Sequence, residues 1–135
     1  MSSRIKSREI AVELSYQMMI NKDTIEETIE NFKENMDDGL NECDFTYITK
    51  VLGGIKENEK DIDIIIEKSL VNWKIERISK VNLAILRVAV YEINYLDEVP
   101  DRVAINEALE ITKKYSDDKS VSFVNAILDN IVKNK

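Results

Sequence analysis

The side chains available for chemistry in this chain are cations and aromatic rings, because the usual catalytic groups are missing. The 135 residues include no histidine and one cysteine, Cys43. This composition excludes a Ser-His-Asp or Cys-His catalytic arrangement and an ordinary zinc site. Acidic residues are plentiful, but they fall on solvated helix faces and form no isolated pair suited to general acid catalysis. We therefore expect a protein that is not an enzyme and that needs no metal or cofactor.

Basic residues occur in three groups with aromatic residues near them in the sequence. The basic groups lie within residues 4–8, 74–87 and 113–119, and the accompanying rings are Tyr16, Tyr91, Tyr115 and Phe123. Cations that contact phosphates, beside exposed rings that stack on bases, are typical of proteins that bind single-stranded RNA. Ordinary core packing is the alternative for each ring, and it is stronger for Tyr91 and Tyr115, whose helix faces point inward. Phe123 and Asn125 lie off the apolar stripe of their helix and mark a candidate binding edge.

The net charge of −7 would argue against a nucleic-acid partner if it were evenly spread. The segment from Asp23 to Asp44 contains nine acidic residues and only one basic residue, Lys33, so it carries a net charge of −8. The remaining chain therefore has a net charge of +1, and local basic patches are compatible with the composition.

A stretch from Ser79 to Leu96 predicts the helix around which the others are arranged. It is apolar on nearly every face, whereas a surface helix would show a single apolar stripe. Ser79 is a suitable N-cap residue. Within this helix Lys80, Arg87 and Asn94 are spaced by seven and share one line, so one edge meets solvent or a polar partner. For Arg87 the residue type favours an ion pair with a nearby acid.

The rest of the chain predicts further helices and no strand, because apolar residues recur at helical spacing and never alternate. Thr24 and Glu27 form a capping box that starts the second helix, Gly39 ends it, and Pro100 separates the central helix from the next one. The adjacent Gly53 and Gly54 mark either a bend or a close approach of another helix. The expected helices cover about 2–20, 25–36, 44–70, 79–96, 101–115 and 120–132, with a short turn through 73–78.

The predicted fold is all-α, a single domain over residues 1–135 with sub-bundles at roughly 1–70 and 72–135. In the helix after Pro100, the residues expected to face inward are Ala104, Ala108, Ile111 and Tyr115. No apolar run is long enough to cross a membrane, and no signal-peptide pattern is present. A lone cysteine fits a reducing compartment, so we expect a cytoplasmic protein.

Three blocks of the sequence resemble the bacterial NusB family of transcription antitermination factors. They are Arg77 to Glu92, Val99 to Tyr115 (which opens Val-Pro-Asp-Arg-Val-Ala-Ile-Asn-Glu) and Ser122 to Asp129. Their order and spacing are highly specific. The resemblance is strong over residues 72–132, and it is looser but colinear before them, where residues 8–16 follow the family's opening helix.

This resemblance implies two three-helix bundles and a role in transcription regulation. It implies binding of the boxA element in ribosomal RNA operon leaders together with NusE, a small-subunit ribosomal protein, so that RNA polymerase reads through terminators. Some relatives form homodimers that cover the RNA surface. The implied RNA-binding residues are Arg4, Lys6, Arg8, Tyr16, Arg87, Lys119, Ser120 and Phe123. The implied NusE-binding surface lies near Glu76 and Asn82.

This chain departs from the family pattern at two places. The basic arm has three cations interrupted by serines, where relatives often carry a denser arginine run, so RNA affinity would depend more on NusE. Ala126 stands where glycine is common, which a helix interior tolerates. A purely protein-binding helical adaptor and an RNA-binding module of an RNA-modifying enzyme are the alternatives. The RNA hypothesis expects a single cationic rim, made of Arg4, Arg8, Arg87, Lys119 and Phe123.

Overall fold

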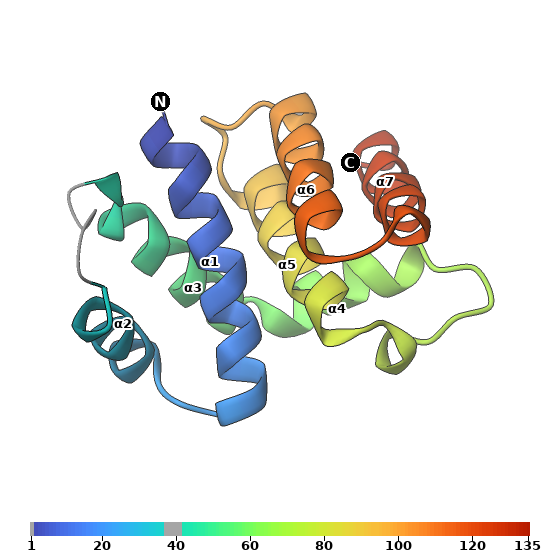
Figure 1. Ribbon diagram of the computed structural model, residues 1–135. Helices are drawn as coiled ribbons and strands as arrows, with labels where there is room; N and C mark the ends of the chain where they lie inside the picture. The colour runs from blue at the N-terminus through green and yellow to red at the C-terminus, as the bar shows by residue number, and fades with distance from the viewer. Residues whose placement is uncertain (1, 37–41) are drawn as a thin grey trace.

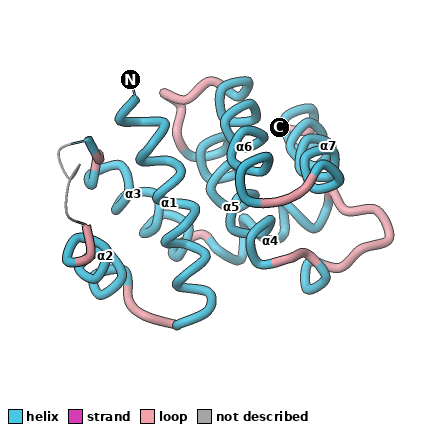
Figure 2. The backbone as a smooth tube through the Cα atoms, viewed as in Figure 1, coloured by secondary structure: helices cyan, strands magenta, loops and turns pink. Residues whose placement is uncertain are grey.

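The computed structural model describes residues 2–36 and 42–135 and is built from α-helices joined by short loops (Figures 1 and 2). Across these described ranges there is no strand, and no helix is long and apolar enough to cross a membrane. The all-α prediction is therefore confirmed. The elements in chain order are α1 (Ser2–Asn21), α2 (Ile25–Glu34), α3 (Phe45–Glu57), α4 (Glu59–Lys68), a single 3-10 turn η2 (Ile75–Arg77), α5 (Lys80–Tyr95), α6 (Asp101–Tyr115) and α7 (Asp118–Lys133).

Helix α5 is the centre of the fold, as its sequence predicts. Eleven of its sixteen residues are buried, and it packs against α1, α3, α4, α6 and α7. Helices α1, α2 and α3 form one three-helix bundle, and α5, α6 and α7 form the other. Figure 1 shows α5 between α1 and α6, where the two bundles meet. The Ser79 hydroxyl caps α5 by accepting a hydrogen bond from the Asn82 backbone N–H at 3.2 Å.

The other predicted start signals are also present, but one predicted end is not. Thr24 and Glu27 form both hydrogen bonds of the capping box, and α6 begins directly after Pro100. Helix α2 ends at Glu34 with Asn35 as its C-cap residue, earlier than the predicted end. The predicted stop at Gly39 lies outside the described residues.

The stretch from 44 to 70 was predicted as helical, with the glycine pair marking a bend or a close approach of another helix. It is helical from 45 to 68 except at Asn58, which separates α3 from α4. Helix α3 ends and α4 begins at Asn58, whose backbone N–H and side-chain Nδ2 both donate to the Gly54 carbonyl, at 3.0 and 2.8 Å. A side-chain amide that binds the backbone in this way competes with helix continuation. The two glycines lie inside α3, and only Gly54 has a structural reason to be glycine. A Cβ atom added there would overlap the Tyr91 ring of α5, whereas one added to Gly53 would meet nothing within 4 Å.

The inward face of α6 was predicted correctly except at its last residue. Ala104, Ala108 and Ile111 are buried, but the Tyr115 side chain is 44% exposed. The prediction that Tyr115 points inward is wrong, because the core contact at this end of α6 is made by Thr112, whose hydroxyl donates to the Ala108 carbonyl at 2.7 Å.

The glycine pair gives a direct test of this packing. We expect Gly54→Ala to lower the free energy of unfolding by about 1–3 kcal/mol, because the added methyl group must displace the Tyr91 ring. The matched control Gly53→Ala should raise it by up to about 1 kcal/mol, since alanine favours helix and the site is open. Urea unfolding of both variants measures the difference. Equal effects would mean that α3 and α5 do not approach each other as described.

Candidate nucleic-acid interface

The first turns of α7 bring three of the predicted RNA-binding residues together. Asp117 caps the helix by accepting from the Ser120 backbone N–H at 2.8 Å. Lys119 and Ser120 lie four and three residues before Phe123, so the three side chains share one face of α7. Lys119 is exposed, and Ser120 and Phe123 are half-buried. We call Lys119, Ser120 and Phe123 the α7 face.

Asn82 holds the α7 face against the central helix. Its Nδ2 donates to the Ser120 hydroxyl oxygen at 2.9 Å, which joins the first turns of α5 and α7. The side chain is only 7% exposed, and its Oδ1 is buried with no hydrogen-bond partner among the described residues. The NusE-binding surface predicted near Asn82 stays a prediction, and the Asn82 side chain itself is engaged with Ser120.

Tyr16 lies in a separate cavity. This cavity has a volume of about 300 Å³ and is lined mainly by α1, including Tyr16, with Val81 of α5 and Tyr115 of α6. The Tyr115 hydroxyl and Lys114 Nζ both donate to Glu9 Oε2, at 2.7 and 2.8 Å. Val81 lines the cavity, and the next residue, Asn82, binds Ser120, so α5 connects the cavity to the start of α7.

Two carboxyl groups of α1 respond to their positions around this cavity. Burial raises the pKa of Glu13, which lines the cavity without a hydrogen-bonded cation. For Glu9, burial acts in the same direction, but the hydrogen bonds from Lys114 and Tyr115 outweigh it and lower the pKa below its ordinary value. Glu9 is therefore ionised at neutral pH and keeps Tyr115 fixed at the edge of the cavity.

The basic arm at the start of α1 is partly neutralised by acids. The Arg4 guanidinium lies 4.3 Å from the centre of the Tyr47 ring and 3.8 Å from Asp44. Lys6 Nζ is 3.1 Å from Glu42 in an exposed pair. Exposed pairs of this kind contribute little to stability, so a phosphate group can replace the carboxylate at small cost.

Arg8 does not belong to this arm, and the prediction that it is an exposed RNA contact is wrong. It is 3% exposed, and its Nε donates to both carboxylate oxygens of Glu92, at 2.8 and 3.1 Å. Tyr47 donates to Glu92 as well, at 2.9 Å, and Glu107 lies 3.8 Å from Arg8 NH1. A signal was present in the sequence: Glu92 interrupts the most apolar helix, and a buried acid requires a buried partner.

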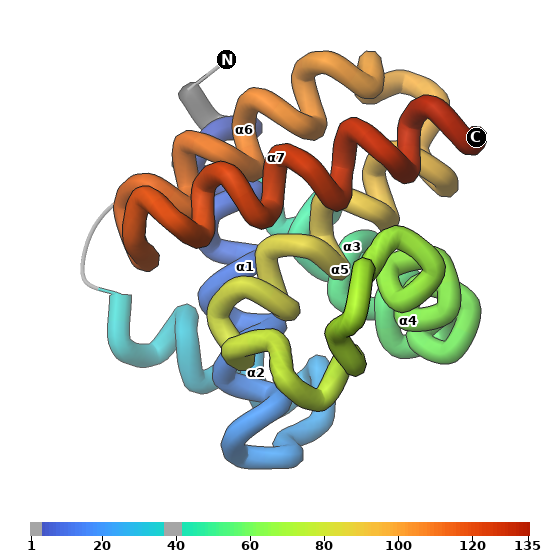
Figure 3. The backbone as a smooth tube through the Cα atoms, turned by 90° about the vertical axis from the view of Figure 1, so that its right-hand side faces the viewer, coloured from blue at the N-terminus to red at the C-terminus, as the bar shows by residue number. Residues whose placement is uncertain are grey.

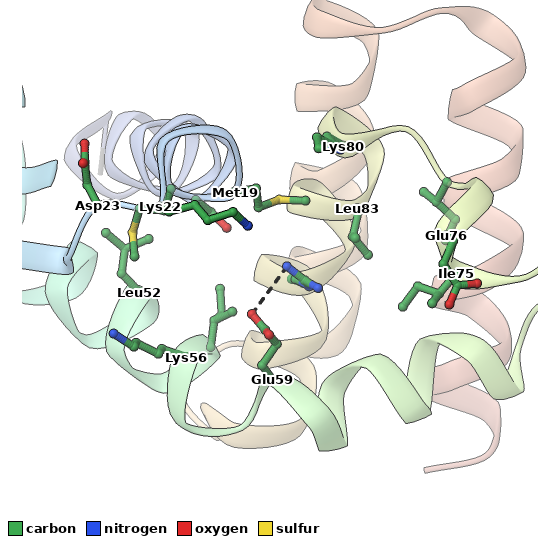
Figure 4. Close-up of a pocket in the computed structure, with 15 residues that line it drawn as sticks. Met19, Lys22, Asp23, Leu52, Lys56, Glu59, Ile75, Glu76, Lys80 and Leu83 are labelled. Atoms are coloured by element: carbon green, nitrogen blue, oxygen red, sulfur yellow. Dashed lines mark ion pairs between the residues drawn. The ribbon is translucent and has the colours of Figure 1, made fainter.

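Arg87 forms the ion pair that its residue type favours, and it faces a different groove. Its Nε and NH2 donate to the two oxygens of Asp63, at 3.0 and 2.8 Å, and its side chain is 12% exposed. The groove has a volume of about 570 Å³ and is lined by parts of α1, α3, α4, η2 and α5 (Figure 4). Glu59, whose ion pair with Arg87 is drawn there, and Glu76 both line it. Glu76 is exposed on η2, as a partner-binding residue requires.

The predicted single cationic rim is therefore not present. Arg8 lies in the core, Arg87 faces the groove beside α4, and Arg4 packs on Tyr47 at the start of α1. The structure brings together a smaller set, the α7 face, and places Tyr16 in the cavity lined mainly by α1. Among the described residues there is also no group of three or more histidine, cysteine or acidic side chains arranged to hold a metal ion.

Comparison with known proteins agrees with this architecture. The NusB family model matches residues 5–133. This chain belongs to the NusB family. The transcription antitermination protein NusB of Clostridium botulinum strain Alaska E43 is 58% identical over 131 residues, which cover 97% of this chain and 98% of that protein. The NusB protein of Clostridium novyi is 48% identical, with the same coverage of both chains.

Solved NusB structures share the fold over nearly the whole chain. Thermotoga maritima NusB is 33% identical with a TM-score of 0.82, covering 96% of this chain and 90% of that one. A crystal structure of the antitermination factors NusB and NusE in complex with double-stranded RNA contains a chain that is 26% identical, with a TM-score of 0.85. The match covers 100% of this chain and 99% of that one. The predicted family resemblance is confirmed.

Sequence reasoning missed one aromatic neighbour of the α7 face in this NusB-family chain. Trp73 was assigned to a short turn, but its ring centroid lies 6.1 Å from that of Phe123. The contact joins the segment between α4 and η2 to α7, and no local pattern in the sequence predicts such a pairing.

The buried pair of Arg8 and Glu92 should be essential for stability. We expect Arg8→Met to lower the free energy of unfolding by about 3–5 kcal/mol, because it leaves the Glu92 carboxylate buried without its cation. Lys133→Met, which removes an exposed pair with Asp129 on α7, is the matched control and should change stability little. Urea unfolding followed by circular dichroism measures both. Similar small effects of the two substitutions would contradict the structural role of Arg8.

Proposed function

We propose that this chain is a transcription antitermination factor. In this role it binds single-stranded boxA RNA of ribosomal RNA operon leaders together with NusE and promotes read-through by RNA polymerase. The main support is the match, over its whole length, to the NusB chain of a complex that contains NusE and RNA. The relatives named as transcription antitermination proteins, which align over nearly their whole length, add to that support.

The α7 face has the groups that an RNA strand requires. Lys119 is an exposed cation for a phosphate, and Phe123 offers a ring on which a base can stack. The Ser120 hydroxyl oxygen accepts from Asn82, so its own hydrogen remains available to donate to an RNA oxygen or base nitrogen. Tyr16 lines the cavity that Val81 of α5 also lines, and Arg4 and Lys6 add positive charge at the start of α1. Arg87 is the assigned contact with the least support, because Asp63 already occupies its guanidinium.

The assignment of a NusE contact to Glu76 rests on the exposed carboxylate at the edge of the groove, where a cation of the partner would find an acceptor.

A homodimer that covered the α7 face would exclude RNA, so the mass of the protein in solution should be measured in every binding experiment. A factor that acts on growing transcripts works in the cytoplasm and carries out no catalysis of its own.

A purely protein-binding adaptor is the second candidate, because Arg4 and Lys6 of the basic arm are already paired with Asp44 and Glu42. Under this alternative the arm would serve only to hold α1 against the start of α3.

Titration of boxA RNA with and without NusE, at two salt concentrations, separates these functions. We expect binding that strengthens with NusE and weakens with salt, because phosphate contacts release counterions. Lys119→Gln should weaken binding and reduce the slope of log K against log salt by about 1. Lys133→Gln, at the far end of α7, should leave both unchanged. Absence of RNA binding under every condition would favour the adaptor.

Arg87→Ala provides an independent test in the same assay. The family resemblance predicts weaker RNA binding by a protein that remains folded. The ion pair with Asp63 predicts instead that the substitution costs stability, because the half-buried Asp63 loses its cation. A lower melting temperature with unchanged RNA affinity would remove Arg87 from the RNA-binding residues.

A further inference from the structure

Trp73 is a large aromatic side chain that the fold only half covers. Its ring is tilted by 53° against that of Phe123, with the centroids 6.1 Å apart, and the residue is 52% exposed. A tryptophan whose purpose was to fill the core would be covered on both faces. Phe123 covers part of the Trp73 ring and leaves the rest open to a partner.

Hydrogen bonds join the segment that carries Trp73 to α7 at its start and to α4 at its end. At its start, the Ser69 hydroxyl accepts from Asn130 Nδ2 of α7 at 2.9 Å. At its end, Glu67 accepts from the Ile75 backbone N–H at 3.3 Å. Between these bonds Asn72 has a φ of 62°, a left-handed conformation that asparagine tolerates better than most residues. These bonds restrain the backbone on both sides of Trp73, and the Phe123 ring contacts the indole, so ordering this segment on binding costs less entropy.

This arrangement extends the α7 face along the helix. Lys119, Phe123 and Asn130 lie on one side of α7 at helical spacing, and the segment 69–73 runs beside the last two. Figure 3 views the molecule from the side on which α7 and this segment both face the reader. Trp73 is thus continuous with the proposed RNA-binding residues and does not form a separate patch.

The charges near the ring favour a polyanion. Lys74 and Arg77 follow Trp73 by one and four residues in the sequence, and Lys119 is one turn from Phe123 on α7. All three are exposed, and none has a carboxylate within 4 Å among the described residues. A rigid ring beside unpaired cations is the combination with which proteins hold an unpaired base and its phosphates.

We propose that Trp73 stacks on an unpaired base of the bound RNA, next to the base or backbone segment that contacts Phe123. This proposal rests on the proposed function. It adds to the α7 face a residue from a segment far away in the sequence, and it limits the RNA at this position to a single-stranded nucleotide, because a paired and stacked base would offer no free face.

Trp73 is the only tryptophan of the chain, so its environment can be observed directly. Chain labelled with 5-fluorotryptophan should give a single ¹⁹F signal in its complex with unlabelled NusE. We expect single-stranded boxA RNA to shift this signal, and a fully paired duplex of the same sequence to leave it in place. RNAs with one abasic site, moved along the strand, should identify one nucleotide whose base is required for the shift.

Substitution then measures the contribution to binding. Trp73→Leu should weaken binding of boxA RNA by the complex with NusE on the order of 5- to 100-fold, the range typical for loss of a stacking ring. Trp73→Phe should recover most of the affinity. The matched control is Tyr95→Leu, which removes another partly exposed ring, stacked on Tyr91 at the opposite end of α5. It should leave RNA affinity unchanged.

The outcomes separate this proposal from the proposed function. If the wild-type complex binds no RNA, the proposed function fails. If it binds RNA while the ¹⁹F signal stays in place and Trp73→Leu binds normally, only the role of Trp73 fails. If Trp73→Leu abolishes the interaction with NusE in the absence of RNA, the ring serves a protein interface, and the stacking role is overturned. Should the variant fold poorly, the ¹⁹F shift of the wild-type chain still decides.

Discussion

The fold depends on a carboxylate buried in the middle of its most apolar helix. Glu92 of α5 is fully buried, and it is tolerated because Arg8 of α1 and Tyr47 of α3 both donate to it. Burial raises the pKa of the Tyr47 hydroxyl, and the neighbouring Glu92 charge raises it further, so this hydroxyl remains protonated and can donate. These hydrogen bonds require defined directions. They fix the positions of α1 and α3 on α5 more narrowly than apolar packing alone would do.

Helix α5 also positions residues at the surface. At the opposite end of α5 from Tyr95, the Asn82 side chain binds Ser120 and sets the start of α7, and Val81 closes the cavity that holds Tyr16. The binding groups are therefore attached to rigid helices and need little rearrangement when a partner arrives. The bond from Asn82 uses only the oxygen of the Ser120 hydroxyl, so the hydroxyl hydrogen remains available to a partner.

Local signals in the sequence located the centre of the fold and most helix starts, but they missed the break between α3 and α4 at Asn58. The capping residues Ser79 and Thr24 and the break before Pro100 act within a few residues, so sequence alone located them. The roles of Arg8 and Tyr115 were not predictable in this way, because the partner of Arg8 lies 84 positions away and the hydrogen-bond partner of Tyr115, Glu9, lies 106 positions away. Family resemblance placed Arg8 among the RNA contacts, and its burial corrects that assignment.

The central claim is that RNA lies along the α7 face and not in the groove beside Arg87. Photo-crosslinking tests it most directly, with boxA RNA that carries 4-thiouridine and with the complex of this chain and NusE, followed by mass spectrometry of the attached peptides. We expect crosslinks in the segment around Trp73, in the first turns of α7 and near Tyr16. Crosslinks confined to the residues that line the groove, such as Lys56 and Glu59, would contradict the proposed interface.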